Sequence, residues 1–330
     1  MKKRICWLPR TVITFFVVFL LTPTMALTQE KDYPKEPITL LVPFGAGGAT
    51  DLAARAVARF LPNYMGQPLV VMNKPGAGGA LAMESLIRSK ADGYTMMMAA
   101  IATNTLTPAF TPKLPFKYDE ITFICRTQLN PAVLVVRADA PWKTLADLVA
   151  DIKRNPGKYI YGTSGMGSMH NLGACKFFKV AGIDPKSVTM IPFNSGQEQV
   201  VAMMGGNIHF SYINLVEALA QLKAARLRAL AAAPNRLEAF PGVPTFAESG
   251  YAEVDVMGWR GVVGPPQLPE SIVKTWVQAM EKVCQDKGWI ETAVKLGDLP
   301  AYLGPKEFKT FVTNEYNEAK TLAESLGIGK

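Results

Sequence analysis

The chain has 330 residues, of which 49% are hydrophobic and 19% are charged, and this balance excludes a largely disordered protein. Its length predicts two domains, each with a core large enough to fold without disulfides. The formal net charge is +8, but the basic residues are interspersed with acidic ones and form no basic cluster with interleaved aromatic residues. Nucleic acid is therefore not an expected partner.

The amino terminus has the pattern of a secretory signal peptide. Basic residues precede the apolar run from Val12 to Leu21, and Thr24-Met25-Ala26 supplies small residues at the two expected cleavage positions. Ten residues are too few to cross a bilayer core of about 30 Å as a helix. We expect cleavage after Ala26, which lowers the net charge to +4 because the segment holds four basic residues and no acidic one. An uncleaved anchor is the alternative.

Cysteines and histidines are few and widely spaced. Cys6 leaves with the signal segment, and Cys125, Cys175 and Cys284 remain, so at least one thiol is unpaired. We expect all three to be small buried hydrophobic residues, with a disulfide between two of them as the alternative. The chain has two histidines and no CxxC, so no zinc spacing is recognisable, and we expect neither a metal nor a cofactor.

From residue 33 onward, short apolar runs alternate with helical patterns. The first half predicts strands at 38–42, 69–72 and 94–98, and helices at 51–61 and 80–89. The second half begins with a strand at 132–136 and a helix-starting box at Thr144 to Asp147. It continues with strands at 159–161, 188–191, 208–212, 227–232 and 254–263, and helices at 168–180, 197–204, 216–224, 271–285, 289–296 and 306–326. This rhythm predicts parallel strands covered by helices, in two α/β lobes.

Glycine-rich turns stand between strands and helices in both halves. They are Pro43 to Asp51, Asn73 to Gly79, Tyr161 to Ser168 and Pro192 to Gln197. Backbone N–H groups at the start of a helix bind anions, and ligands settle at the carboxyl ends of strands in such sheets. Neither a Walker loop nor GxGxxG is present, so a nucleotide is poorly supported. These turns predict an anion-binding cleft between the lobes, and tight turns without a ligand are the alternative.

Ser164 raises the question of serine hydrolysis, because His170 follows six residues later. The GxSxG elbow is not met, since Met166 stands at its last position, and no acid that would orient a base is recognisable. His209 lies in an apolar run and is read as structural. We expect no enzyme, and a secreted α/β hydrolase that uses Ser164 is the alternative.

A series of motifs resembles the substrate-binding proteins of tripartite tricarboxylate transporters, the Bug family. In chain order they are PFGAGGATD, NKPGAGG, ADGYT, YGTSGMGS, IPFNSGQEQVVAMMGGNI and LKAARLRALA, and the resemblance spans Tyr33 to the carboxyl terminus. It implies an α/β periplasmic-binding protein of type II, with two lobes that close like a Venus flytrap about a hinge and a central ligand cleft. It also implies a monomeric periplasmic protein that captures an organic carboxylate, a di- or tricarboxylate or an aromatic acid, for a membrane permease.

The resemblance also implies the lobes and the ligand-binding residues. Lobe 1 comprises 27–130 and 250–330, lobe 2 comprises 131–249, and the signal segment is 1–26. Hinge closure is expected near Pro131 to Val136 and Glu253 to Gly258. Amides, hydroxyls and waters would hold the carboxylate at Phe44, Gly45, Ala46, Gly47, Gly48, Thr50, Thr103, Asn104, Ser164, Gly165, Met166, Gly167, Ser168, Asn194, Ile213 and Arg260.

Several of these positions depart from the family pattern or add to it. Ala46 stands where the family often has proline, and Met166 where it often has asparagine. Ile213 replaces the aspartate of a common FDN element, which suggests a less polar or purely anionic ligand. Arg260, in a WRGV stretch, is a candidate clamp for a second carboxylate, and packing on Trp259 or pairing with an acid at the lobe interface is the alternative. A ligand-sensing module for a membrane receptor remains a further alternative to transport.

Overall fold

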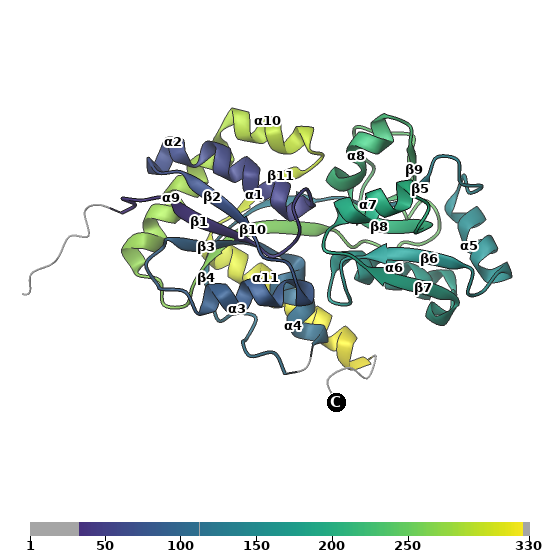
Figure 1. Ribbon diagram of the computed structural model, residues 1–330, viewed down its shortest axis with the longest axis horizontal. Helices are drawn as coiled ribbons and strands as arrows, with labels where there is room; N and C mark the ends of the chain where they lie inside the picture. Colours follow the sequence, from purple (N-terminus) through teal and green to yellow (C-terminus); the bar gives the residue numbers. More distant parts are fainter. Residues whose placement is uncertain (1–32, 112, 326–330) are drawn as a thin grey trace, which may run out of the picture. The chain divides into compact units, whose positions relative to one another are not determined.

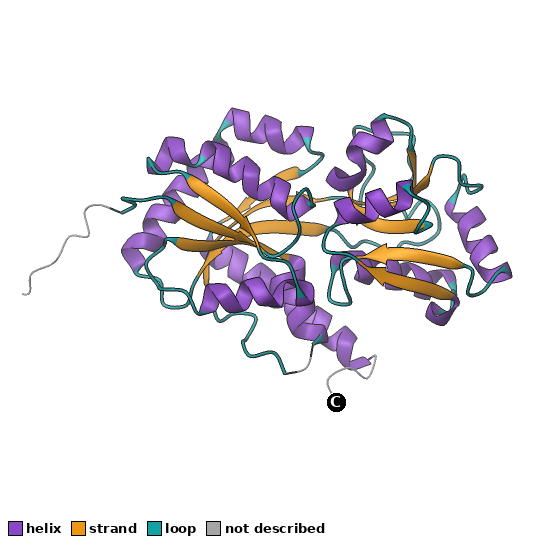
Figure 2. Ribbon diagram, viewed as in Figure 1, coloured by secondary structure: helices purple, strands orange, loops and turns teal. Residues whose placement is uncertain are grey.

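The computed structural model describes residues 33–111 and 113–325, which form two β-sheets flanked by helices (Figures 1 and 2). The signal segment expected at 1–26 lies outside the described residues. Across the ranges that are described, no helix combines the length and hydropathy needed to span a membrane.

The first sheet has six strands and is mixed. Its order is β11 (Leu299–Leu303), β4 (Thr122–Asn130), β10 (Gly258–Gly264), β3 (Thr95–Ala100), β1 (Ile38–Val42) and β2 (Leu69–Asn73). Strand β1 is parallel to β2 and β3, as the sequence predicts. The expectation of parallel strands is wrong for β10, which pairs antiparallel with β3 and β4, and β11 also pairs antiparallel with β4. Strand β4 carries the chain toward the second sheet and β10 carries it back, so these two neighbours run in opposite directions.

Helices cover both faces of this sheet because its central strands alternate their side chains. Met96 and Met98 of β3 pack in the core beneath α1 (Ala49–Phe60), α9 (Glu270–Gln285) and α10 (Lys287–Lys295). Met97 and Ala99 face α3 (Ala80–Ile87) and α11 (Pro305–Ser325) on the other side. Figure 1 shows the short helices α2 (Pro62–Met65) and α4 (Thr107–Phe110) on these same two sides. The side chains from Met96 to Ala99 thus alternate between two apolar layers.

The second sheet has five strands, in the order β7 (Val188–Pro192), β6 (Tyr159–Thr163), β8 (Phe210–Asn214), β5 (Ala132–Arg137) and β9 (Leu227–Ala233). Strand β6 is parallel to β7 and β8, whereas β5 is antiparallel to β8 and β9. Helices α5 (Leu145–Arg154) and α6 (Met169–Ala181) pack on one face, and α7 (Gly196–Met204) and α8 (Leu215–Lys223) on the other. The predicted start of α5 is confirmed, because the Thr144 hydroxyl accepts from the Asp147 amide and the Asp147 carboxylate accepts from the Thr144 amide.

Two segments carry the chain between the sheets. Strand β4 ends at Asn130 and β5 begins at Ala132, so only Pro131 separates them. The chain returns through 234–257, between β9 and β10. Pro131 and residues 253–257 of the second crossing fall within the segments where a hinge is expected.

The three described cysteines and His209 agree only in part with what the sequence predicts for them. All three described cysteines are free, and Cys125 and Cys284 are buried. The expected burial is wrong for Cys175, which is exposed because it lies beside the α6 stripe that faces the core. His209 is structural, since its Nδ1 accepts from the Ile160 amide at 3.0 Å, and burial lowers its pKa.

Candidate functional site

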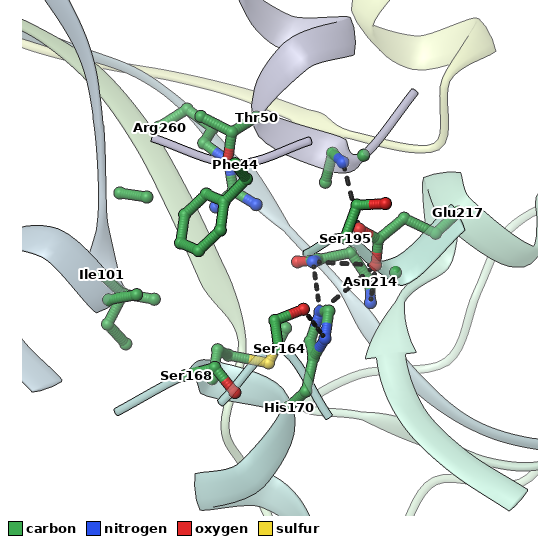
Figure 3. A pocket seen from close by; sticks show the side chains of 16 residues that line it. Phe44, Thr50, Ile101, Ser164, Ser168, His170, Ser195, Asn214, Glu217 and Arg260 are labelled. Atoms are coloured by element: carbon green, nitrogen blue, oxygen red, sulfur yellow. Dashed lines mark hydrogen bonds and ion pairs between the residues drawn. The ribbon is translucent and has the colours of Figure 1, made fainter. Parts of the chain in front are cut away.

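A small cavity of about 30 Å³ lies where the carboxyl ends of strands from both sheets meet (Figure 3). Its lining comes from the β1–α1 turn, the end of β3, the β6–α6 turn, the start of α7, the β8–α8 turn and β10. The lining residues are Phe44, Gly48, Ala49, Thr50, Ala100, Ile101, Ala102, Ser164, Ser168, Met169, His170, Ser195, Gly196, Asn214, Glu217 and Arg260. This is the position at which open α/β sheets bind ligands.

The first glycine-rich turn already has acceptors for several of its amides. The Gly45 amide donates to the Asn194 carbonyl at 3.0 Å, and the Gly47 amide donates to Asp51 Oδ2 at 2.9 Å. The Ala49 amide donates to Glu217 Oε1 at 3.1 Å. Two of these three bonds join the turn to the second sheet's loops. Backbone amides of this turn are therefore less available to a ligand than the sequence suggests.

The second-sheet turn contributes two serines to the cavity lining, Ser164 and Ser168, and the second of them also begins a helix. Ser168 Oγ accepts from the Asn171 amide at 3.1 Å and so caps α6. Ser164 Oγ lies 3.0 Å from His170 Nδ1 and accepts from Gln199 Nε2 at 3.0 Å. Gln199 Nε2 also lies 2.9 Å from His170 Nδ1. This buried network fixes the imidazole within the lining.

Glu217 is a buried carboxylate that bridges the two halves of the site. Its Oε1 accepts from the Ala49 amide, while its Oε2 accepts from the Asn214 amide at 3.0 Å and lies 3.2 Å from His170 Nε2. Burial by itself would raise the pKa of Glu217. The charge and hydrogen bond of His170, together with the bonds from Ala49 and Asn214, outweigh that effect and hold the pKa at about 2. Glu217 is therefore ionised at neutral pH.

Arg260 supplies the cationic part of the lining. The residue is 4% exposed, and its Nη1 donates to the Trp259 carbonyl at 2.7 Å. Its Nε has no hydrogen-bond partner among the described residues. Burial lowers its pKa, and the nearby carboxyl groups of Asp298 and Glu217 oppose this. Figure 3 shows Arg260 and Phe44 on one side of the view and Glu217, Asn214 and His170 on the other.

Ser164, His170 and Glu217 form a chain of contacts that resembles a catalytic triad, but the serine and the acid contact the opposite ring nitrogens of the histidine. In serine hydrolases the nucleophile approaches Nε2 and the acid bonds to Nδ1. Here Ser164 faces Nδ1 and Glu217 faces Nε2. In addition, the Gln199 amide group contacts both the hydroxyl and Nδ1. The lining polar groups are thus joined into one network.

The structure brings together six of the residues that the resemblance implies. Phe44, Gly48, Thr50, Ser164, Ser168 and Arg260 line the cavity. Gly165, Met166, Gly167 and Asn194 line an adjoining open groove instead. Gly45, Ala46 and Gly47 belong to the first turn but not to the lining of the cavity.

Three other predicted residues are buried away from the cavity. Thr103 and Asn104 lie in a π-helical turn, η2 (Ala102–Leu106), where Thr103 Oγ1 accepts from the Ala100 amide at 3.1 Å. Ile213 is fully buried in the apolar layer under α7 and α8. None of these three lines the cavity, because tertiary packing and local turns already use their side chains.

The most informative missed residues are Asn214 and Glu217. Their spacing directly after a strand is that of a helix-starting box, and the Asn214 amide donates to Glu217 Oε2, while Asn214 Oδ1 has no partner among the described residues. That signal places a carboxylate at the carboxyl end of β8. No group of histidine, cysteine and acidic side chains in the described ranges could hold a metal ion.

Comparisons with known proteins agree on one family. The profile of the tripartite tricarboxylate transporter family receptor matches residues 53–328. The protein BugT of Bordetella pertussis is 30% identical over 302 residues, covering 90% of this chain and 92% of that protein. A solved periplasmic transporter has a TM-score of 0.86 at 31% identity, covering 90% of this chain and 99% of that one.

A further solved structure contains a ligand. It is MatC from Rhodopseudomonas palustris with bound malate, which has a TM-score of 0.82 at 25% identity and covers 88% of this chain and 100% of that one. These likenesses confirm the predicted two-lobed α/β fold of periplasmic binding proteins.

Proposed function

Because the chain belongs to the tripartite tricarboxylate transporter receptor family, we propose that it is a periplasmic solute-binding protein that captures an organic carboxylate without chemical turnover. Lobe 1, at 27–130 and 250–330, and lobe 2, at 131–249, would enclose the solute. The protein would act as a monomer, after removal of residues 1–26, and deliver the solute to membrane permease subunits. Malate bound to MatC supports a carboxylate as the solute class.

Arg260 is the single observation that carries this proposal. A buried guanidinium with an unused N–H on a cavity favours an anion that can accept from it. Carboxylates accept from arginine through two oxygens in a planar arrangement. The hydroxyl groups of Ser164 and Thr50 lie on the same lining and add further donors.

Replacing Arg260 tests the proposal. Loss of a charge-assisted hydrogen bond weakens binding by about 1.5–3 kcal/mol, so Arg260→Met should lower carboxylate affinity about tenfold to 100-fold. Arg260→Lys keeps the charge without the planar fork and should lose less. Isothermal titration calorimetry of protein freed of bound solute by unfolding and refolding measures both.

The control is Arg126→Met, which removes a half-buried arginine of β4 that stacks on Phe311 and does not line the cavity. Its affinity should match that of the unmodified protein. Equal affinities for Arg260→Met and the unmodified protein would contradict a carboxylate bound at Arg260.

A secreted hydrolase that uses Ser164 is the second candidate, and the Ser164–His170–Glu217 contacts favour it. The exchanged ring nitrogens and the Gln199 contacts argue against it. We expect no turnover of short-chain esters above a Ser164→Ala control. Neighbouring genes for a permease or for a sensor kinase would separate transport from sensing.

A further inference from the structure

The charged side chains on the cavity lining are few and nearly balanced. Arg260 contributes one positive charge, Glu217 contributes one negative charge, and His170 is the remaining titratable group. With a neutral imidazole, the lining has no net charge. With an imidazolium, whose charge lies 3.2 Å from Glu217, the lining has one net positive charge. Asp298 interacts electrostatically with Arg260 from outside the lining and adds no positive charge in either state.

Glu217 also occupies a place where a ligand carboxylate would otherwise bind. It accepts from the first-turn amide of α1 and from the amide of its own helix cap. Its carboxyl group also lies against Gly196 at the start of α7, because an added Cβ there would be 2.1 Å from Glu217 Cδ. Starts of helices are the usual binding places for anions. Here the chain provides the anion itself.

These observations leave one favourable place for a ligand carboxylate. At the Arg260 side, a cationic group has an unused N–H. At the Glu217 side, a second carboxylate would meet a fixed negative charge, while the Gly45, Gly47 and Ala49 amides already have acceptors. A buried charge without a partner is strongly disfavoured.

We propose that Glu217 determines the ligand class, so that the cavity binds solutes with one carboxylate at Arg260 and rejects those with a second carboxylate at the opposite end. The inference rests on the proposed function and narrows it. It differs from the dicarboxylate that MatC holds. It also replaces the expectation that Arg260 clamps the second carboxylate of a polycarboxylate.

Matched pairs of acids test this assignment, because the members of each pair differ only in a terminal methyl or carboxylate. The pairs are butanoate and succinate, pentanoate and glutarate, and hexanoate and adipate. Calorimetric titration near neutral pH would use protein processed from the full-length gene, refolded to remove bound solute. For the pair of acids whose length fits the site, we expect the affinity for the monocarboxylate to be at least about tenfold higher than the affinity for the dicarboxylate.

Glu217→Gln keeps the shape of the side chain and removes its charge. We expect the preference for the monocarboxylate to fall by about tenfold in this variant. Glu248→Gln is the matched control, because Glu248 accepts from the amide three residues earlier, that of Thr245, as Glu217 does from Asn214, and lies outside the cavity lining. Its preference should equal that of the unmodified protein.

The outcomes separate the two proposals. Monocarboxylate preference in the unmodified protein, reduced in Glu217→Gln alone, supports the role of Glu217. If the unmodified protein binds the dicarboxylate as tightly as the monocarboxylate, or more tightly, the role of Glu217 is overturned, whether or not the variant folds. The proposed capture of a carboxylate is unaffected by that result. An unchanged preference in folded Glu217→Gln also overturns it. Absence of binding by every acid overturns the proposed function and the role of Glu217 together.

Discussion

Gly196 has no side chain, and this allows the carboxylate of Glu217 to lie against the start of α7. An alanine Cβ at this position would be 2.1 Å from Glu217 Cδ and 2.2 Å from Oε2. Neither distance is tolerable for nonbonded atoms, so Glu217 would have to leave its bonds to Ala49 and Asn214. The backbone of Gly196 is not in the left-handed region, and the requirement for glycine there is therefore steric.

Gly196→Ala should lower the free energy of unfolding by about 1–3 kcal/mol, the usual effect of overpacking. Urea unfolding followed by tryptophan fluorescence measures it. Gly242→Ala is the control, because no atom lies within 4 Å of its added Cβ, and its change should stay within about 0.5 kcal/mol. Equal stability of the two variants would show that Glu217 is not held against α7.

The hydrophobic pattern of the sequence predicts some helices and strands more accurately than others. The helices α1 and α9 place apolar residues at helical spacing, so their predicted bounds agree closely with the structure, and for α5 the predicted start agrees. Strand β4 was not predicted, because Arg126 and Gln128 interrupt its apolar pattern. Strand β11 was not predicted either, since Pro300 within a five-residue run argues against a strand.

The sequence predicts which turns form the site, but it does not predict the contacts between them. Strand–glycine–helix order locates Phe44, Gly48 and Ser164 near a ligand site from local chemistry alone. The bond between Ala49 and Glu217 joins positions 168 residues apart, and it depends on how the two sheets close on each other. No local pattern contains that information. For the same reason the sequence did not show that Glu217 uses an amide of the predicted anion site.

The turn that leads into β11 has a pH-dependent effect on stability. Asp298 is buried there and accepts from Gln128 Nε2 at 2.5 Å and Asn130 Nδ2 at 2.6 Å, both of β4. Burial raises its pKa to about 7, although hydrogen bonds and the charge of Arg260 lower it. Burial also raises the pKa of Glu315 to about 7. Both groups hold protons in the folded state that an unfolded chain releases near pH 4.

The sign of the effect follows from proton linkage. Between about pH 4 and pH 7 the folded state binds more protons than the unfolded state at these two groups, so they make the free energy of unfolding fall as the pH rises. Asp298→Asn should remove about half of this decrease, and Glu315→Gln should remove the rest. Urea unfolding at several pH values measures it. An identical pH dependence in the unmodified protein and both variants would contradict these raised pKa values.

At the scale of the whole described molecule, the cavity is closed by bonds between loops of the two sheets. Gly45 donates to the Asn194 carbonyl, Ala49 donates to Glu217, and Thr107 Oγ1 lies 3.5 Å from the Gly167 carbonyl. Breaking these bonds would expose buried Arg260 to a solute. The two crossings, at Pro131 and at 234–257, are the segments about which the sheets can separate.

Small-angle X-ray scattering should therefore detect a change on ligand binding. We expect a smaller radius of gyration with a saturating carboxylate than without it, because a bound solute adds contacts to both lobes and shifts the population toward the closed state. Glu217→Ala removes one closing bond and should enlarge the ligand-free protein further, whereas Glu248→Ala, outside the cavity lining, should not. Identical profiles with and without ligand would contradict hinge closure, since a permanently closed cavity would not admit the solute.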